Sequence, residues 1–313
     1  MHGMKRWAGV VLVITFATAV AGPSSSDAAT PAPAVAACHR PHASGQFARS
    51  FKFKGKTRTF QLYVPPAYKG TKPVPLVFNF HGYGSNAVEQ MVYGNFKPQA
   101  DRHDFLIVAP DGQDNGGGRH FSLGSEAGLQ NDVTMVQSLL THIEHGYCID
   151  ATRVYSTGMS DGGAMTSILA CVAPKKFAAF AAVAVILYCG MKGNPPVALA
   201  SFQGTADPVV PYNGGAVHCC GGTVLPSKPV SMAKWAAFDH CAKHYVDKRL
   251  GSQVVRRTWN HCAPGSTVVF YIIQGGGHTW PGSIPIKSLG LTTQQIKASD
   301  VIWKFFAAHK LAT

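Results

Sequence analysis

The run Gly158-Met159-Ser160-Asp161-Gly162 constrains the fold of this chain more than any other stretch. It follows a strand-like segment at 154–157 and opens a helical pattern at 160–171 that contains alanine and methionine. A strand that reverses into a helix within a few residues forces its central residue into a strained backbone conformation, and side chains at the flanking positions would collide with the neighbouring elements. The sequence therefore predicts a sharp corner that lifts the Ser160 hydroxyl clear of a sheet.

Apolar runs and helical periods alternate along the rest of the chain. The segment 75–80 is continuously apolar, as in a strand buried on both faces, whereas 57–64 alternates like a half-exposed strand. Further buried strands are expected at 105–109, 179–185, 197–203 and 267–273, and further helices at 132–145, 231–241 and 292–309. This alternation predicts an α/β fold, a mainly parallel sheet with helices on both faces.

The N-terminus has the pattern of a secretory signal peptide. Lys5 and Arg6 precede an apolar run at 7–20, which is shorter than the roughly 20 residues that a membrane span needs. We expect a signal peptide at 1–22, a disordered Ser/Ala/Pro-rich lead-in at 23–45, and a single domain at 46–313, because no linker leads to a second module.

Eight cysteines in an exported chain predict disulfides. No C-x-x-C pair occurs and the histidines are scattered, so no metal site is expected. Cys148 precedes the strand that leads to Ser160, and the following helix returns Cys171 to the same edge of the sheet. Position in the sheet therefore gives the expected pairs Cys148–Cys171 and Cys189 with Cys219 or Cys220, and Cys241 and Cys262, which bracket a short basic segment, are expected to pair with each other.

Cys38 has two further interpretations. It can pair with whichever of Cys219 and Cys220 remains. Alternatively, the preceding Val35-Ala36-Ala37 resembles a lipoprotein processing site and would make Cys38 a lipid anchor, although it lies far beyond the apolar run.

The formal net charge of +13, with a sequence pI near 9.4, raises the question of an anionic partner. Basic residues gather at 51–56 and 248–257. No nucleic-acid-binding motif accompanies them, so we expect a solvated basic surface and no nucleic-acid partner.

A serine hydroxyl becomes an effective nucleophile only with a base beside it and an acid that orients the base. Asp207 follows the strand expected at 197–203 in the turn Gly204-Thr205-Ala206-Asp207-Pro208, and His278 follows the last strand in a loop containing Gly275-Gly276-Gly277. Their order after Ser160, each at the carboxyl end of a strand, predicts a Ser160–His278–Asp207 catalytic set. The alternatives are a turn-stabilising aspartate and a surface histidine.

The oxyanion of such a reaction needs two backbone N–H donors. One is expected at Asp161, at the positive end of the helix that follows Ser160, and the other at Tyr83 in the glycine-containing loop after the strand at 75–80. His81 is expected to brace that loop rather than act as a base. Trp280 and Tyr212 flank the catalytic loops and are candidate pocket walls, with simple packing as the alternative.

With these residues in place, the chain resembles the secreted esterase family that contains poly(3-hydroxybutyrate) depolymerases, LpqC-type proteins and feruloyl esterases. The resemblance runs from about residue 58 to the C-terminus. It rests on four segments: His81-Gly82-Tyr83-Gly84, Thr157-Gly158-Met159-Ser160-Asp161-Gly162-Gly163, Gln203 to Tyr212, and Gly276-Gly277-His278-Thr279-Trp280-Pro281-Gly282. It implies an α/β-hydrolase catalytic domain at 46–313, the same Ser160, Asp207 and His278, and hydrolysis of carboxylic esters outside the cytoplasm without a cofactor.

Departures from the family, among them an unusual Cys219-Cys220-Gly221-Gly222 loop, leave the substrate open. Arg119-His120-Phe121 stands where such proteins usually carry a Trp-Asn pair, and no added substrate-binding module is present. Polyesters, their oligomers, and feruloyl or acetyl xylan esters all fit the resemblance. A non-catalytic binding protein on the same fold, a peptidase and an acyl transferase are the functional alternatives of other classes.

Overall fold

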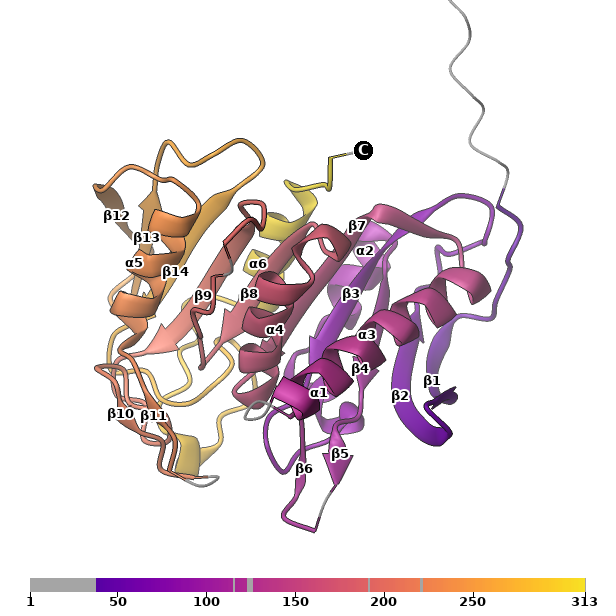
Figure 1. Ribbon diagram of the computed structural model, residues 1–313, viewed down its shortest axis with the longest axis horizontal. Coiled ribbons are helices and arrows are strands. Elements are labelled where there is room, and N and C mark those ends of the chain that lie inside the picture. The colour runs from indigo at the N-terminus through magenta and orange to yellow at the C-terminus, as the bar shows by residue number, and fades with distance from the viewer. Residues whose placement is uncertain (1–37, 115, 123–125, 191, 220–221, 313) are drawn as a thin grey trace, which may run out of the picture. The chain divides into compact units, whose positions relative to one another are not determined.

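A ten-stranded sheet organises the part of the chain that the computed structural model describes, which is residues 38–114, 116–122, 126–190, 192–219 and 222–312, without the side chains of 126–131. Its strand order is β1-β2-β4-β3-β7-β8-β9-β14-β13-β12 (Figure 1). The bounds are β1 Gly45–Phe53, β2 Lys56–Val64, β3 Val74–Phe80, β4 Leu106–Pro110, β7 Ile149–Met159, β8 Ala179–Val183, β9 Ala198–Gly204, β12 Tyr245–Arg249, β13 Val254–Trp259 and β14 Thr267–Ile273.

The strands from β4 to β14 in this order run parallel, whereas β1, β2, β13 and β12 pair antiparallel at the two sides. The central strands are continuously buried, because helices cover both faces. Two small hairpins pair β5 Gln113–Asp114 with β6 Arg119–His120, and β10 Gly215–Ala216 with β11 Val224–Leu225. The fold is the expected α/β fold with a mainly parallel sheet.

Six α-helices are described, three packed on each face of the sheet (Figure 1). One face carries α3 Glu126–Gly146, α4 Asp161–Val172 and α5 Lys228–Phe238, whose apolar side chains share a core with Phe78 and Phe180. The other carries α1 Ala87–Tyr93, α2 Lys97–His103 and α6 Ala298–Ala307, packed with Ile107 and Phe202. The sheet therefore separates two apolar cores, as its double-sided burial requires.

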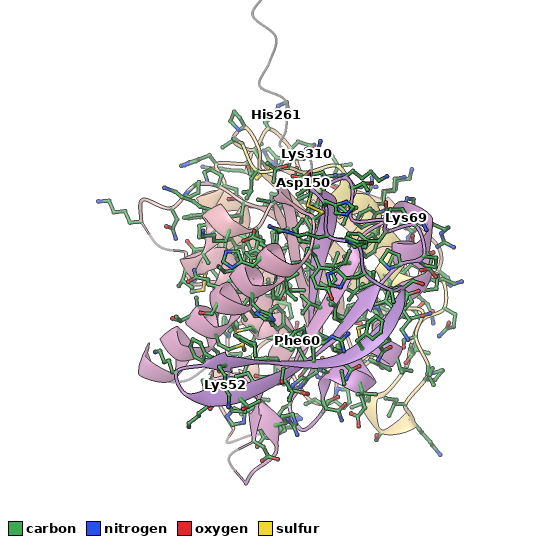
Figure 2. All side chains as sticks on the ribbon, turned by 90° about the vertical axis from the view of Figure 1, so that its right-hand side faces the viewer. Lys52, Phe60, Lys69, Asp150, His261 and Lys310 are labelled. Carbon is green, nitrogen blue, oxygen red and sulfur yellow. A yellow bond between two sulfur atoms is a disulfide. The ribbon has the colours of Figure 1, made fainter. Side chains whose placement is uncertain are left out.

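Strand β1 was not expected from the sequence, although its signal is present. Phe51 and Phe53 are buried and Lys52 between them is exposed, which is the period-two pattern of a half-buried strand. Lys54 and Gly55 both have positive φ, 48° and 78°, and form the tight turn into β2. Figure 2 views the sheet from this side, with Lys52 and Phe60 labelled.

The segment 38–44, expected within a disordered lead-in at 23–45, is ordered and β1 begins at Gly45. A disulfide joins Cys38 to Cys148, the Arg40 amide donates to the Gly70 carbonyl at 2.8 Å, and the Tyr68 hydroxyl donates to the Arg40 carbonyl at 2.9 Å. These contacts compensate for the lack of an apolar pattern. The disulfide also excludes the lipid-anchor interpretation of Cys38, because its sulfur is already bonded. The expected signal peptide at 1–22 and residues 23–37 lie outside the described residues.

The expected pair Cys148–Cys171 is wrong, and so is the pairing of Cys189 with Cys219 or Cys220. Cys171 pairs instead with Cys189. After β8 the chain turns back along α4, where the Leu187 amide donates to the Ser167 hydroxyl, so Cys189 reaches the end of the helix rather than the opposite edge of the sheet. Cys219 is also disulfide-bonded. The pair Cys241–Cys262 is present, as expected.

The helix expected at 292–309 is shorter than its periodicity suggested and starts at Ala298. Thr292 and Thr293 are buried, and the Thr293 hydroxyl donates to Gln253 at 2.7 Å, so polar contacts hold an irregular segment there. Within the described residues no helix is long and apolar enough to cross a membrane.

Candidate active site

The corner between β7 and α4 places Ser160 at the carboxyl edge of the sheet. Ser160 has φ 57° and ψ −116°, a conformation that non-glycine residues rarely adopt. A Cβ on Gly158 would lie 2.5 Å from the Gly162 carbonyl oxygen, and one on Gly162 would lie 2.1 Å from that of Phe80. The two glycines are therefore required by close backbone approach, as the sequence predicted. The Ser160 amide donates to the Val183 carbonyl of β8 at 2.9 Å, which ties the corner to the sheet.

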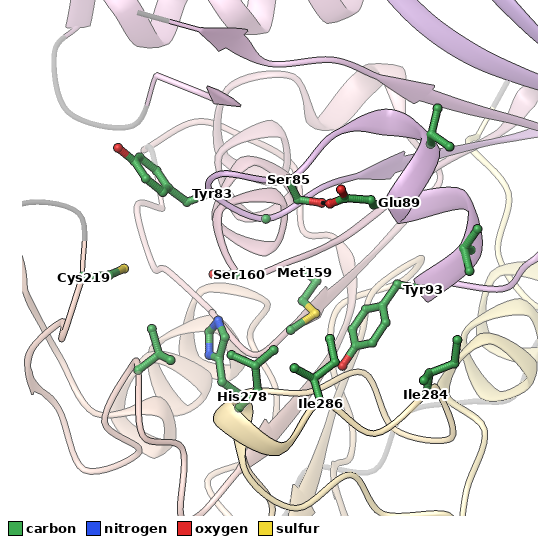
Figure 3. Close-up of a pocket in the computed structure, with 15 residues that line it drawn as sticks. Tyr83, Ser85, Glu89, Tyr93, Met159, Ser160, Cys219, His278, Ile284 and Ile286 are labelled. Carbon is green, nitrogen blue, oxygen red and sulfur yellow. Dashed lines mark hydrogen bonds between the residues drawn. The ribbon is translucent and has the colours of Figure 1, made fainter. Parts of the chain in front are cut away.

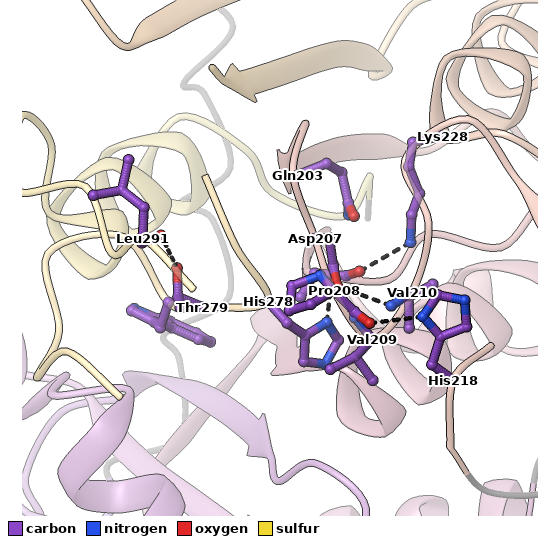
Figure 4. A network of polar contacts seen from close by, with 12 residues as sticks. Gln203, Asp207, Pro208, Val209, Val210, His218, Lys228, His278, Thr279 and Leu291 are labelled. Atoms are coloured by element: carbon purple, nitrogen blue, oxygen red, sulfur yellow. Dashed lines mark hydrogen bonds and ion pairs between the residues drawn. The ribbon is translucent and has the colours of Figure 1, made fainter. Parts of the chain in front are cut away.

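His278 and Asp207 form a buried pair, with 2.8 Å between Nδ1 and Oδ2 (Figure 4). The other carboxylate oxygen of Asp207 accepts the amides of Val209 and Val210, each at 2.8 Å, so the carboxylate is held from both sides. Because the carboxylate accepts a hydrogen bond from Nδ1–H, the neutral imidazole carries its hydrogen on Nδ1 and leaves Nε2 unprotonated. This is the tautomer that a general base needs.

The loop carrying His278 is fixed by the segment 289–291. The His278 amide donates to the Leu289 carbonyl at 2.7 Å and the Gly277 amide to that of Leu291 at 2.9 Å. A Cβ on Gly277 would lie 2.0 Å from the Leu289 carbonyl oxygen. Glycine at position 277 thus permits close packing of this loop against the segment 289–291.

Ser160 and His278 line the same pocket, and Figure 3 shows the imidazole pointing toward the Ser160 hydroxyl. No hydrogen bond between them is present in the described part of the structure. Such bonds are often long in unliganded hydrolases and shorten when substrate binds. The structure therefore brings together the three residues that the sequence singled out.

The two expected oxyanion donors lie on either side of Ser160. Asp161 is the first residue of α4, where backbone N–H groups lack intrahelical acceptors. On the other side, a Cβ on Gly82 would lie only 3.4 Å from the Ser160 Cβ, which brings the Gly82–Tyr83 backbone next to the nucleophile position. The Tyr83 ring is anchored by its hydroxyl, which donates to the Gly117 carbonyl at 2.5 Å.

The Asp161 side chain is directed into the protein, away from His278. Its carboxylate accepts the Phe121 amide at 2.6 Å. The pKa of Asp161 is raised to about 7. Burial is the largest cause and the charge of Asp132 adds to it, while the Phe121 hydrogen bond and His120 act in the opposite direction. Asp132 is itself fully buried and lies 3.6 Å from Arg58.

His81 braces the loop that holds Tyr83. Its Nε2 accepts the Gly112 amide at 2.9 Å, so the proton of the neutral ring lies on Nδ1, which donates to the Gly82 carbonyl at 2.7 Å. Burial lowers the pKa of His81, which keeps this neutral form. Both ring nitrogens of His81 thus form hydrogen bonds to the backbone, and the expected bracing role is confirmed.

An apolar pocket of about 630 Å³ opens beside Ser160 (Figure 3). One wall comes from α1 through Val88 and Val92, which are 51% and 56% exposed, and the facing wall comes from Ile284 and Ile286. The remaining lining residues are Gly82, Tyr83, Ser85, Glu89, Tyr93, Met159, Val209, Cys219 and Leu289. Neither wall was predicted from the sequence. The i,i+4 spacing of Val88 and Val92 resembles that of a helix facing a core, so it does not indicate a pocket wall.

Neither aromatic residue expected to line the pocket does so. Trp280 is 1% exposed, packs edge-on against Phe96 and donates from its indole nitrogen to Ser299 at 3.0 Å. Tyr212 is half-buried and stacks on Phe270. Both belong to the packing of the cores, because the loops that carry them turn inward next to the catalytic loops.

The Arg119-His120-Phe121 segment lies outside the apolar pocket. Phe121 is buried in a core, and Arg119 faces a separate polar cavity beside Asp111 and Asp114. The Arg119 carbonyl accepts the Gly84 amide at 2.8 Å and the His120 ring lies 5.6 Å from that of Tyr83, so the departure from the family lies beside the Tyr83 loop and not in the apolar walls. Within the described residues, no three His, Cys, Asp or Glu side chains gather as a metal site would require.

The fold and the arrangement of the site are those of an α/β-hydrolase. Among solved structures, an acetyl xylan esterase from Aspergillus awamori superposes with a TM-score of 0.60 at 15% identity, covering 84% of this chain and 99% of that one. A likeness at this level of identity shows the fold, and the strained serine corner fits it.

Sequence comparison shows similarity to one family of esterases. Residues 58–208, which include Ser160 and Asp207, match the family model described as Esterase PHB depolymerase. A probable feruloyl esterase C of Aspergillus oryzae is 29% identical over 260 residues, covering 80% of this chain and 84% of the relative. A putative esterase NocK of Nocardia uniformis subsp. tsuyamanensis is 26% identical, covering 97% and 99%. The chain resembles this family over that segment, and it is a carboxylic ester hydrolase.

Proposed function

We propose that the chain is an exported serine esterase in which Ser160 is the nucleophile, His278 the general base and Asp207 the residue that orients the base. The observation that carries this assignment is the buried His278–Asp207 pair, 2.8 Å apart, facing a serine on a strained corner. Such strain is retained where a protein needs an exposed nucleophile.

The reaction proceeds in two acyl-transfer steps. As the Ser160 oxygen bonds to the ester carbonyl carbon, its proton passes to Nε2 of His278, and the amides of Tyr83 and Asp161 bind the oxyanion. His278 then protonates the leaving alkoxide as the carbon–oxygen bond breaks. Water, deprotonated by His278, attacks the acyl-enzyme, and the acid leaves as Ser160 recovers its proton.

The substrate that we propose is an ester with a bulky, largely apolar acyl group, from a polyester, its oligomers or a related ester. The apolar pocket of about 630 Å³ is far larger than an acetyl group requires, and aliphatic side chains form its walls. The family description supports 3-hydroxybutyrate polyesters, and the names of the relatives support feruloyl esters as the second candidate. The pocket favours both over acetyl xylan.

Export and domain organisation are parts of the same proposal. The disulfides Cys38–Cys148, Cys171–Cys189 and Cys241–Cys262 fit an oxidising compartment, and the sequence pattern at 1–22 fits a signal peptide. Residues 46–313 then act as a single catalytic domain. N-terminal sequencing of exported protein should begin after residue 22 and at or before Cys38, since cleavage beyond Cys38 would remove a disulfide.

A hydrolysis panel tests the proposal. It contains 3-hydroxybutyrate oligomers, amorphous polyester, methyl ferulate and acetylated xylan, each with the parent and with Ser160→Ala. We expect the variant to lose turnover by about 10⁴-fold or more while keeping its circular dichroism spectrum. Turnover retained by Ser160→Ala would overturn the nucleophile assignment, and no turnover by the parent on any ester would favour a binding protein on the same fold.

A further inference from the structure

A lysine lies in the interior directly behind the catalytic residues. Lys228, the first residue of α5, is 1% exposed and is the only lysine among the described residues that is fully buried. Lysines are rarely buried, because removing an ammonium group from water is costly without a partner of opposite charge. A methionine would fill a similar volume without this cost. The position of the charge therefore requires an explanation.

The ammonium group binds the corner that supports the nucleophile. Lys228 Nζ donates to the Ala184 carbonyl at 2.9 Å. Ala184 follows β8 and has φ 63°, a left-handed conformation that costs free energy in a residue with a Cβ. The residue before it, Val183, accepts the Ser160 amide through its carbonyl at 2.9 Å. One hydrogen bond from Lys228 thus holds a strained corner one residue from the backbone contact of Ser160.

Electrostatics connect the same lysine to the catalytic acid. Figure 4 shows Lys228 reaching from α5 toward the region that contains Asp207 and His278. Burial lowers the pKa of Lys228 to about 8, and the negative charge of Asp207 opposes this shift. Among the elements packed around Lys228, Asp207 supplies the charge that interacts with its ammonium group. The positive charge of Lys228 in turn stabilises the negative charge of the buried Asp207 carboxylate.

We propose that Lys228 is a positioning residue, whose buried ammonium group holds the Val183–Ala184 corner beneath Ser160 and supplies the positive charge that balances Asp207. The inference rests on the proposed roles of Ser160, His278 and Asp207. Lys228 does not line the pocket, so it acts on the geometry of the reacting groups and not on substrate contacts.

The test compares Lys228→Met and Lys228→Arg with Lys234→Met, a matched control on the exposed side of α5. Using a soluble nitrophenyl ester at pH 7, we expect Lys228→Met to lower kcat by about 10- to 100-fold, because small displacements of reacting groups are costly. We expect KM to change less than about 2-fold because no substrate contact is lost. Lys234→Met should behave like the parent.

The pH dependence of kcat/KM shows whether Lys228 acts through its charge or only by filling space in the interior. The ammonium form is present below pH about 8 and is lost above it, so kcat/KM of the parent should fall as the pH rises from 7 to 10. Lys228→Arg keeps its charge throughout, because guanidinium does not titrate in this range, and its profile should stay flat to higher pH. Lys228→Met should be slow at every pH without this decline.

The Lys228 variants give outcomes that support or overturn the inference. A folded Lys228→Met variant with the kcat and pH profile of the parent would overturn the inference. If Lys228→Met does not fold, Lys228→Arg decides, and an unmoved alkaline decline would count against the role of the charge. If neither folds, a parent profile that is flat to pH 10 would overturn it. An active parent with inactive Ser160→Ala would show that the proposed function stands whichever way these variants behave.

Discussion

The two sides of the active-site pocket are built in opposite ways. On the catalytic side, Asp207 and His278 are 8% and 4% exposed and are held by hydrogen bonds from several loops. In the two apolar walls, by contrast, Val88, Val92 and Ile284 are half exposed or more. Buried polar groups need hydrogen-bond partners, and this requirement fixes their arrangement. Exposed aliphatic groups need no such partners. The difference suggests that the chemistry is fixed rigidly while the choice of acyl group is open to change.

The largest effect within this comparison is expected from Asp207→Asn. The amide keeps the shape of the side chain but favours the wrong tautomer of His278, so kcat should fall by about 10⁴-fold with little change in KM. Steady-state kinetics on a nitrophenyl ester measures both. Turnover close to that of the parent would mean that another carboxylate orients His278.

A smaller and selective effect is expected on the apolar wall from Val92→Ser combined with Ile284→Ser. Loss of apolar contact at two positions should lower kcat/KM for a bulky ester by about 10-fold and for an acetyl ester by about 2-fold or less. Val246→Ser, at an exposed valine on β12 outside the pocket, is the control. Equal losses on both esters would show that the wall does not select the acyl group.

The smallest effect concerns stability on the catalytic side and appears through pH. The pKa of Asp161 is raised by burial to about 7, above its unfolded value, so its stabilising contribution is complete below pH about 4 and is lost as the pH rises through 7. Asp161→Asn keeps an oxygen to accept the Phe121 amide but carries no charge. We expect its melting temperature to exceed that of the parent by a few degrees at pH 8 and by less at pH 5. An equal difference at both pH values would show that Asp161 does not titrate in this range.

The sequence predicted where Ser160, Asp207 and His278 lie because the constraints on their positions are local. Gly158 and Gly162 are required by contacts within a few residues of Ser160 or with the adjacent strand. Asp207 and His278 each follow a strongly apolar strand, so their place at the carboxyl edge follows from the parallel sheet. Patterns of this kind are readable without coordinates.

The features that were missed depend on long-range packing. Whether Val88 and Val92 face a core or a pocket is decided by the loop at 284–289, about 200 residues away along the chain, a separation that leaves no local trace. Trp280 was misplaced for a similar reason, since Phe96 and Ser299 bury it. The disulfide partners of Cys171 and Cys148 depended on the path of the 184–190 loop and of the N-terminal segment.

Part of the basic charge of this chain lies on the two outer strands of the ten-stranded sheet. Exposed Arg49 and Lys52 lie on β1, and exposed Lys248 and Arg249 lie on β12, the two strands with an unpaired side. Unpaired backbone groups invite the matching strand of another molecule, and like charges on both approaching strands repel it. The basic side chains on β1 and β12 thus oppose edge-to-edge pairing of the open sheet with a second molecule. This effect weakens in concentrated salt, because the repulsion is screened.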